Sequence, residues 1–190
     1  FQSVFVDGQF NLDNWKKYID KWVPGAKEMC LGDMKECIDS GYSWNEDYLP
    51  VLNAVYANNE KCKEAVRSFR AVSEHLDEKI INVFGKSVDA DIVLYISLCN
   101  GAGWVTKIRE KTTVLLGIEK ITELDWCSKD DMNGLIIHEL GHVYQSQYGN
   151  LYHKDKSPAE KFLWQLFTEG VAMVFEQKII GNDGYYHQDR

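Results

Sequence analysis

The sequence predicts an α+β fold: N-terminal helices, then a small and mostly antiparallel sheet, then two long helices. Three observations support this order. Apolar residues recur at three- and four-residue steps through the first half of the chain, as on one face of a helix. Three segments rich in β-branched residues follow between residues 91 and 118. The remaining sequence returns to helical spacing and carries clear helix-capping residues.

The N-terminal part is expected to hold helices that each place their apolar residues on one side. The expected helices cover residues 12–22, 27–38, 51–56 and 61–84. Pro24 and Gly25 end the first one, because neither residue continues a helix readily. Gly85 follows the longest helix, at the position where glycine commonly ends one.

The middle of the chain predicts strands, because valine, isoleucine, threonine and aromatic residues dominate it. Residues 91–99 (DIVLYISLC) form one candidate strand, and residues 100–103 (NGAG) supply turn chemistry. Residues 104–108 form a second strand and residues 112–118 (TTVLLGI) a third. We expect these strands to pair in one sheet, with one face covered by the helix predicted over residues 61–84.

Two capped helices are predicted at the end of the chain. Ser128 can cap the first, with Asp131 in the capping-box position, and this helix runs to about residue 147. The second begins at residues 157–160 (SPAE), which combine a cap, a proline in the first turn and a reciprocal acid. Gly181 ends it.

Length and composition indicate one globular domain over residues 1–190. Of these residues, 45% are hydrophobic and 26% are charged, which is ordinary for a protein that buries a core. The formal net charge is −8, the sequence pI is about 5.1, and the lysines are interleaved with acids. Nucleic acid is therefore not expected as a partner, and adhesion to anionic membranes is disfavoured. No stretch reaches the roughly 20 apolar residues of a membrane span.

The five cysteines contain no CxxC pair, so a zinc knuckle built from thiolates is not expected. An odd number in a chain with a full core indicates free, mostly buried thiols and a reducing compartment, hence a cytoplasmic location. A Cys30–Cys37 disulfide in a secreted form is the alternative. The chain begins at Phe1 and not at a methionine, which leaves a trimmed upstream segment and a secreted or surface form open.

The sequence HELGH at residues 138–142 predicts a zinc site. Four residues span just over one helical turn, so His138 and His142 project from the same face and can hold one ion. Glu139 lies roughly 100° around the helix from His138, where its carboxylate can reach a zinc-bound water as general base without becoming a ligand. Gly141 is expected to avoid bulk beside the metal. Coincidence on a buried helix is the alternative, and the capped helix argues against it.

A third protein ligand is expected, and Glu169 is the candidate. Position 148 is tyrosine, so the third histidine of the HExxHxxGxxH pattern is missing. Glu169 has apolar neighbours on both sides, which argues against a solvated position. Gly170 and Ala172 indicate close packing against the first of the two helices. An ordinary surface glutamate is the alternative.

Glu176 lies on nearly the same face of that helix as Glu169. It is expected either to hydrogen-bond a ligand histidine from behind or to face solvent. Should Glu169 not be the ligand, the next candidates are Asp183, His187 and His153.

The two motifs together resemble a known group of enzymes. IIHELGHVYQ followed downstream by LWQLFTEGVAMVFE is similar to the Glu-zincins. More narrowly, it resembles the predicted zinc-dependent peptidases grouped under a domain-of-unknown-function label. The similarity covers roughly the last third of the chain, and the sequence between the two motifs is longer than in thermolysin-type enzymes. It implies a zincin-like fold, Zn²⁺ as cofactor, His138, His142 and Glu169 as ligands, and Glu139 as the base.

These observations predict a zinc metallopeptidase that hydrolyses a peptide or protein substrate. A zinc hydrolase acting on a non-peptide amide, and a binding or regulatory domain with a structural zinc, are the alternatives. In zincins an edge strand pairs with the substrate backbone, and residues 112–118 precede the metal helix in the matching order. A donor that stabilises the oxyanion is expected among Tyr144, Tyr148, Tyr185, Tyr186 and His187. The oligomeric state is not indicated.

Overall fold

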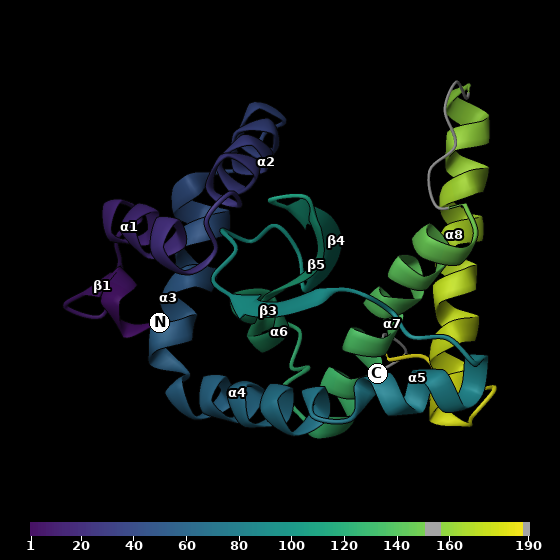
Figure 1. Cartoon of the computed structure of the whole chain (residues 1–190). Coiled ribbons are helices and arrows are strands. Elements are labelled where there is room, and N and C mark those ends of the chain that lie inside the picture. The colour runs from purple at the N-terminus through teal and green to yellow at the C-terminus, as the bar shows by residue number, and fades with distance from the viewer. Residues whose placement is uncertain (151–156, 188–190) are drawn as a thin grey trace.

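The computed structural model describes residues 1–150 and 157–187, and in these residues the α+β class is confirmed (Figure 1). The helices are α1 (Leu12–Trp22), α2 (Lys27–Asp39), α3 (Leu49–Ala57), α4 (Asn59–Ser73), α5 (Leu76–Phe84), α6 (Ile118–Glu123), α7 (Lys129–Tyr148) and α8 (Pro158–Ile180). The strands are β1 (Phe5–Val6), β2 (Gln9–Phe10), β3 (Asp91–Tyr95), β4 (Gly103–Ile108) and β5 (Lys111–Gly117). A 3₁₀ turn at Gln2–Val4 and a π-helical turn at Trp44–Tyr48 complete the order.

The helices predicted for the N-terminal part are confirmed, with one correction. The segment expected as one helix over residues 61–84 forms two, α4 and α5, because the backbone leaves helical geometry at His75, with φ −138° and ψ 25°. Ser73, the last residue of α4, donates its hydroxyl to the carbonyl of Phe69, a bond that tends to bend helices. The break lets α4 pack on α7 while α5 contacts α8.

The predicted helix caps are present. Ser128 accepts a backbone N–H at the start of α7, and Ser157 and Glu160 form a complete capping box at the start of α8. Gly85 and Gly181 follow α5 and α8 in the left-handed conformation, with φ of 69° and 77°, which glycine adopts without steric cost. Local signals therefore delimit both helices that carry the candidate site.

The sheet is mixed, and the prediction of a mostly antiparallel one is wrong. Its strand order is β3-β5-β4, with β5 antiparallel to β4 and parallel to β3. A two-residue turn joins β4 to β5, and both of its residues, Arg109 and Glu110, have positive φ, the geometry of a tight hairpin. The loop of residues 96–102 carries the chain past the position that β5 fills, so β3 and β4 are not neighbours.

β5 is thus the central strand, and the expectation that residues 112–118 form an edge is wrong. Val114, Leu115 and Leu116 are all fully buried, because a strand covered on both faces carries a continuous apolar run. β4 is the edge strand that contacts α7. A further short ladder, β1 with β2, turns through Asp7 and Gly8 and was not expected from the sequence.

α7 lies on the sheet, where the helix over residues 61–84 had been expected. It contacts β4 and β5, while α4 packs against α6 and α7 and not along the strands. α8 packs on α7 as well, on the right of Figure 1. The apolar residues of α7 are accordingly buried: Met132, Leu135, Ile136, Ile137, Leu140 and Val143. α7 therefore lies between the sheet and α8 and contacts both.

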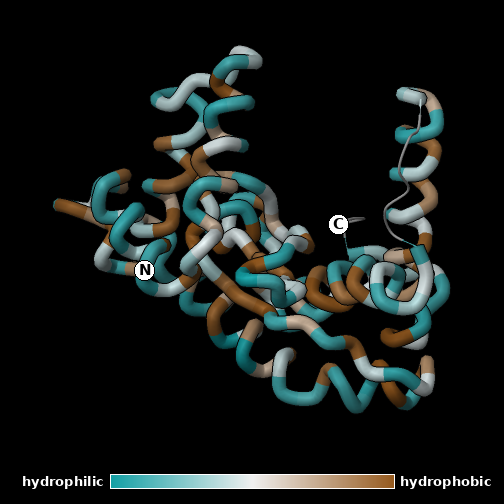
Figure 2. Tube along the Cα trace, turned by 45° about the horizontal axis from the view of Figure 1, so that its top comes forward, coloured by the Kyte–Doolittle hydropathy of each residue, from teal (hydrophilic) through white to brown (hydrophobic). Residues whose placement is uncertain are grey.

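α8 has two environments along its length. Its C-terminal half packs on α7, with Ala172 and Phe175 buried. Its N-terminal half carries exposed apolar side chains: Phe162, Leu163, Leu166 and Phe167 are each more than half exposed. Figure 2 shows apolar residues recurring along this half of the helix, at the right of the view. Within the described residues, no helix combines the length and apolarity needed to cross a bilayer.

Candidate metal centre

α7 holds the His-Glu-x-x-His residues on an enclosed stretch of helix. His138 and Glu139 are buried, and the side chain of His142 is 13% exposed. The two imidazole centroids lie 5.1 Å apart, because four residues advance the helix by just over one turn. Both rings therefore open on the same side of α7.

α8 brings Glu169 to these two rings. Its Oε2 lies 3.2 Å from Nε2 of His138, and its Oε1 lies 3.6 Å from Nε2 of His142. One ligand atom from each of the three residues lies within 4.8 Å of the others. Each carboxylate oxygen thus faces one imidazole nitrogen, and the three residues predicted as ligands come together between the two helices.

The neighbours of Glu169 differ from what its flanking sequence suggests. Leu166 and Phe167 lie exposed, and the side chain of Glu169 is itself 43% exposed. A Cβ placed on Gly170 would meet no atom within 4 Å, so this glycine does not serve helix packing. The apolar flanks therefore do not bury Glu169. Glu169 instead reaches the histidines because it lies on the face of α8 that is turned toward them.

Gly141 sets the distance between α7 and α8. A Cβ there would lie 2.9 Å from Cα of Ala172 and 3.2 Å from Cβ of Phe175. The expectation that Gly141 keeps bulk away from a metal is therefore replaced by a packing role, since glycine permits close backbone approach. This approach carries Glu169 to within reach of the rings on α7.

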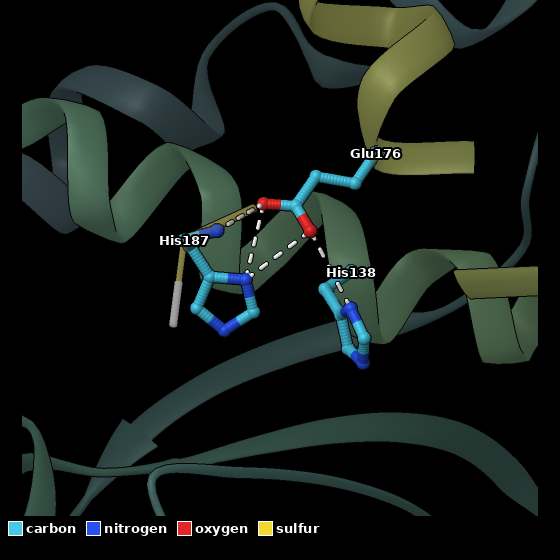
Figure 3. Close-up of side chains that lie close together, drawn as sticks. All are labelled: His138, Glu176 and His187. Carbon is cyan, nitrogen blue, oxygen red and sulfur yellow. Dashed lines mark hydrogen bonds and ion pairs between the residues drawn. The ribbon is translucent and has the colours of Figure 1, made fainter. Parts of the chain in front are cut away.

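A second set of polar side chains lies behind His138 (Figure 3). Oε2 of Glu176 lies 3.5 Å from Nδ1 of His138, an ion-pair distance longer than a good hydrogen bond. Nδ1 of His187 lies 3.0 Å and 3.2 Å from the two oxygens of Glu176, and the backbone N–H of His187 donates to Oε1. Glu176 and His187 are fully buried. Glu176 therefore lies behind the histidine, and the solvent-facing alternative is wrong.

Burial and the neighbouring carboxylates shift the pKa values of the histidines. Burial alone lowers the pKa of His138, but the hydrogen bond to Glu169 and the ion pair with Glu176 outweigh it and raise the pKa to about 9. Burial, followed by the charge on His138, lowers the pKa of His142. The hydrogen bond with His138 holds the pKa of Glu169 below its usual value. The carboxylates therefore favour the charged form of His138, whereas His142 is shifted toward its neutral form.

Glu139 lies against the first residue of β4. A Cβ on Gly103 would lie 2.7 Å from Oε1 of Glu139 and 2.9 Å from its Cδ. Burial raises the pKa of Glu139 to about 7. The carboxylate is thus enclosed between α7 and an edge strand, and a side chain at residue 103 would displace it.

Of the five residues considered as oxyanion donors, three bond to other groups. Tyr148 and Tyr185 donate to backbone carbonyl groups. Tyr144 packs among aromatic rings, and His187 binds Glu176. The Tyr186 ring lies beside one of the two motif histidines, with its centroid 6.0 Å from that of His138.

The alternative ligands do not join the cluster of His138, His142 and Glu169. Asp183 forms an exposed ion pair with Lys178, at 2.8 Å. His153 lies outside the described residues. His187 bonds to Glu176, and its ring centroid lies 5.1 Å from that of His138, but it is grouped with neither His142 nor Glu169. All five cysteines are free, which excludes the Cys30–Cys37 disulfide in this structure, and none belongs to a metal-like cluster of the described residues.

Sequence reasoning missed two glycines and the position of His187. Gly103 and Gly134 each leave space for a carboxylate of this region. Gly134 did offer a signal, because a glycine inside a helix costs up to about 1 kcal/mol and usually has a packing reason. Its partner could not be read from the pattern, since His187 comes from beyond α8.

Comparison with known proteins provides no relative: no family model, no curated protein and no solved structure matches the chain. The resemblance to the Glu-zincins therefore depends on the two motifs alone.

Proposed function

We propose that this protein is a zinc-dependent hydrolase that cleaves peptide bonds, with His138, His142 and Glu169 as metal ligands and Glu139 as general base. The observation that carries the proposal is the convergence of three ligand atoms, from two helices, within 4.8 Å of one another. A fourth side chain, the buried carboxylate of Glu139, is adjacent to His138 in the motif.

The donor set suits zinc. Two imidazole nitrogens and one carboxylate oxygen are ligands that zinc accepts in catalytic sites. A neutral imidazole that binds a metal through Nε2 carries its proton on Nδ1. In His138 that nitrogen is buried and faces Glu176, which is how protein carboxylates commonly orient a ligand histidine.

The number of donors favours an enzyme over a protein with a structural zinc. Structural zinc sites are closed by four protein ligands, whereas catalytic sites keep one position open. In the described residues the cluster of His138 and His142 with Glu169 comprises three side chains. Glu169 is 43% exposed, so a substrate can reach the cluster from its side.

Glu139 has the properties of a general base. Zinc, when bound, supplies Lewis-acid chemistry that lowers the pKa of water and polarises a carbonyl group. Glu139 takes the proton from the attacking water and passes it to the leaving amine, a role worth about 10²–10⁴-fold in rate. Its pKa of about 7, raised by burial, lies near neutral pH, where a base of this kind acts efficiently.

The edge strand β4 supports a peptide as the substrate. β4 pairs with β5 along one side only in the described residues, so its other side offers backbone donors and acceptors. It begins at Gly103, directly against Glu139. An extended peptide added along this edge would pass beside the base.

The test compares wild type with Glu139→Gln, using zinc content and turnover of a peptide library. We expect both proteins to bind about one zinc per chain, and Glu139→Gln to lose about 10²–10⁴-fold in kcat. Glu28→Gln, an exposed change on α2, is the matched control and should keep full activity. Absence of zinc, or undiminished turnover by Glu139→Gln, would contradict the proposal. Cleavage of small amides but of no peptide would favour the non-peptide alternative.

A further inference from the structure

The chain after α8 folds back onto α7. We call residues 182–187 the C-terminal turn. The side chain of Gln177 donates to the carbonyl of Tyr185 at 3.1 Å, and the Tyr185 hydroxyl donates to the carbonyl of Asp130 at 3.2 Å. These bonds tie the C-terminal turn to both helices, and its last residue, His187, is 0% exposed.

The C-terminal turn packs against α7 at Gly134, where the helix has no side chain. A Cβ on Gly134 would lie 2.6 Å from Cβ of His187, 2.8 Å from Oε1 of Glu176 and 2.8 Å from the hydroxyl oxygen of Tyr185. Gly134 stands one helical turn before His138. Any larger residue there would displace the C-terminal turn from the metal-binding helix.

At this contact, His187 supplies most of the hydrogen bonds to Glu176. A fully buried carboxylate is costly unless donors surround it. The carboxylate oxygens of Glu176 accept hydrogen bonds from the ring Nδ1 and the backbone N–H of His187 at 3.0–3.2 Å. Nδ1 of His138 lies farther away, 3.5 Å from Oε2. Figure 3 shows the carboxylate between the two rings. Loss of His187 would leave Glu176 free to rotate, and His138 without a fixed partner.

These three residues also lie close enough to hold an ion of their own, since their ligand atoms are within 4.8 Å. The chemistry disfavours it. If His138 binds metal through Nε2, its Nδ1 carries a proton and cannot be a ligand. His187 already places two donors of one residue on one oxygen of Glu176. The arrangement is that of a hydrogen-bonded support.

We propose that His187, carried by the C-terminal turn, is a positioning residue that orients His138 through Glu176 and thereby sets the zinc affinity of the site. This inference rests on the proposed function, because it takes His138 as a zinc ligand. It adds that the end of the described chain, far from the ligands in sequence, controls how tightly the metal is held.

The experiment measures zinc affinity by competition with a chelator, in wild type, His187→Leu and His187→Asn. Leucine removes the ring donor, whereas the amide of asparagine keeps an N–H at the position of Nδ1. We expect His187→Leu to lose about 10–100-fold in zinc affinity, as for other supports of ligand histidines, and His187→Asn to stay close to wild type. Co²⁺ as a probe should show altered visible bands in His187→Leu only.

Gly134→Ala provides a second variant, which removes none of the named side chains but displaces the C-terminal turn that carries His187. It should lose zinc affinity as His187→Leu does, whereas Gly32→Ala, on α2 with no atom within 4 Å of the new Cβ, should not. Thermal unfolding with chelator present shows whether each variant is folded. If His187→Leu and Gly134→Ala are folded and bind zinc with wild-type affinity, the role of His187 is overturned and the proposed function is not. Equal losses of zinc affinity in His187→Asn and His187→Leu would have the same consequence. Two zinc ions per wild-type chain would make His187 a ligand instead. A wild type that binds no zinc would overturn the proposed function as well.

Discussion

The two carboxylates that approach the histidines from α8 have different surroundings. Glu169 is 43% exposed and faces Nε2 of both histidines, whereas Glu176 is fully buried behind His138. The i, i+7 spacing places both on one face of the helix. Burial and the identity of the facing nitrogen therefore separate a candidate ligand from a supporting group.

Glu169→Ala should mainly lose zinc affinity, whereas Glu176→Ala should mainly lose stability. Glu169→Ala removes one of the three proposed ligands from a half-exposed position. Zinc binding should therefore weaken far more than in Glu176→Ala, while stability with chelator present changes little. Glu176→Ala leaves two buried histidines without their acceptor and should cost about 3 kcal/mol or more. Chelator competition and thermal unfolding of both variants measure this. The opposite ranking of zinc affinities would remove Glu169 as the third ligand.

Gly103→Ala tests the enclosure of the base. The new Cβ would lie 2.7 Å from Oε1 of Glu139, and the flexible side chain would move before the backbone does. Because a displacement of about 1 Å can cost roughly 10²-fold in rate, kcat should fall by about that factor. Zinc content and melting temperature should stay near wild type. Full activity in this variant would show that Glu139 does not act from its observed position.

At the scale of elements, the close approach of α7 and α8 depends on one glycine and not on the other. Gly141 meets the backbone of Ala172, whereas Gly170 faces open space. Both glycines lie inside helices, so a change to alanine has a similar effect on helix propensity at each. A difference in stability between the two variants therefore reports the effect on packing.

Gly141→Ala and Gly170→Ala should therefore change stability in opposite directions. Gly141→Ala pushes the helices apart and should lower the free energy of unfolding by about 1–3 kcal/mol. Gly170→Ala introduces no contact and should raise it by about 0.5–1 kcal/mol. Urea denaturation of the two variants measures both values. Equal effects would mean that α7 and α8 do not pack as described.

For the whole molecule, one buried carboxylate outside the candidate site couples stability to pH. Oε1 of Glu119 accepts hydrogen bonds from Ser97 N, Ser97 Oγ and Cys99 N, at 2.7–2.8 Å, and its Oε2 is buried without a partner. These bonds hold the loop between β3 and β4, in which Leu98 and Cys99 have positive φ. Burial raises the pKa of Glu119 above its usual value.

Glu119→Gln should therefore gain stability over wild type as pH rises. A raised pKa in the folded state means that the protonated acid stabilises the fold at low pH and that this contribution is lost as pH passes the folded pKa. Glutamine keeps the acceptor oxygen and carries no charge. The difference in melting temperature between variant and wild type should grow as pH rises above the ordinary glutamate pKa of 4.5. A constant difference would contradict the raised pKa.

The sequence by itself determined the ends of α7 and α8, the common face of His138 and His142, and the place of Glu139 beside them. These features arise from interactions within one helical turn, such as the cap at Ser157 and the left-handed Gly181. A local pattern contains all the atoms involved, so it can be read residue by residue.

Only the tertiary structure decided the order of the strands, the break before Leu76, and which carboxylate of α8 faces which nitrogen of His138. The loop of residues 96–102 places β5 between β3 and β4, Gly141 lets α8 approach, and His187 reaches Glu176 from beyond the helix. Each of these outcomes depends on contacts between residues far apart in the chain. The free energy of such contacts depends on how well surfaces that are distant in the sequence fit together. A local sequence pattern does not contain this information.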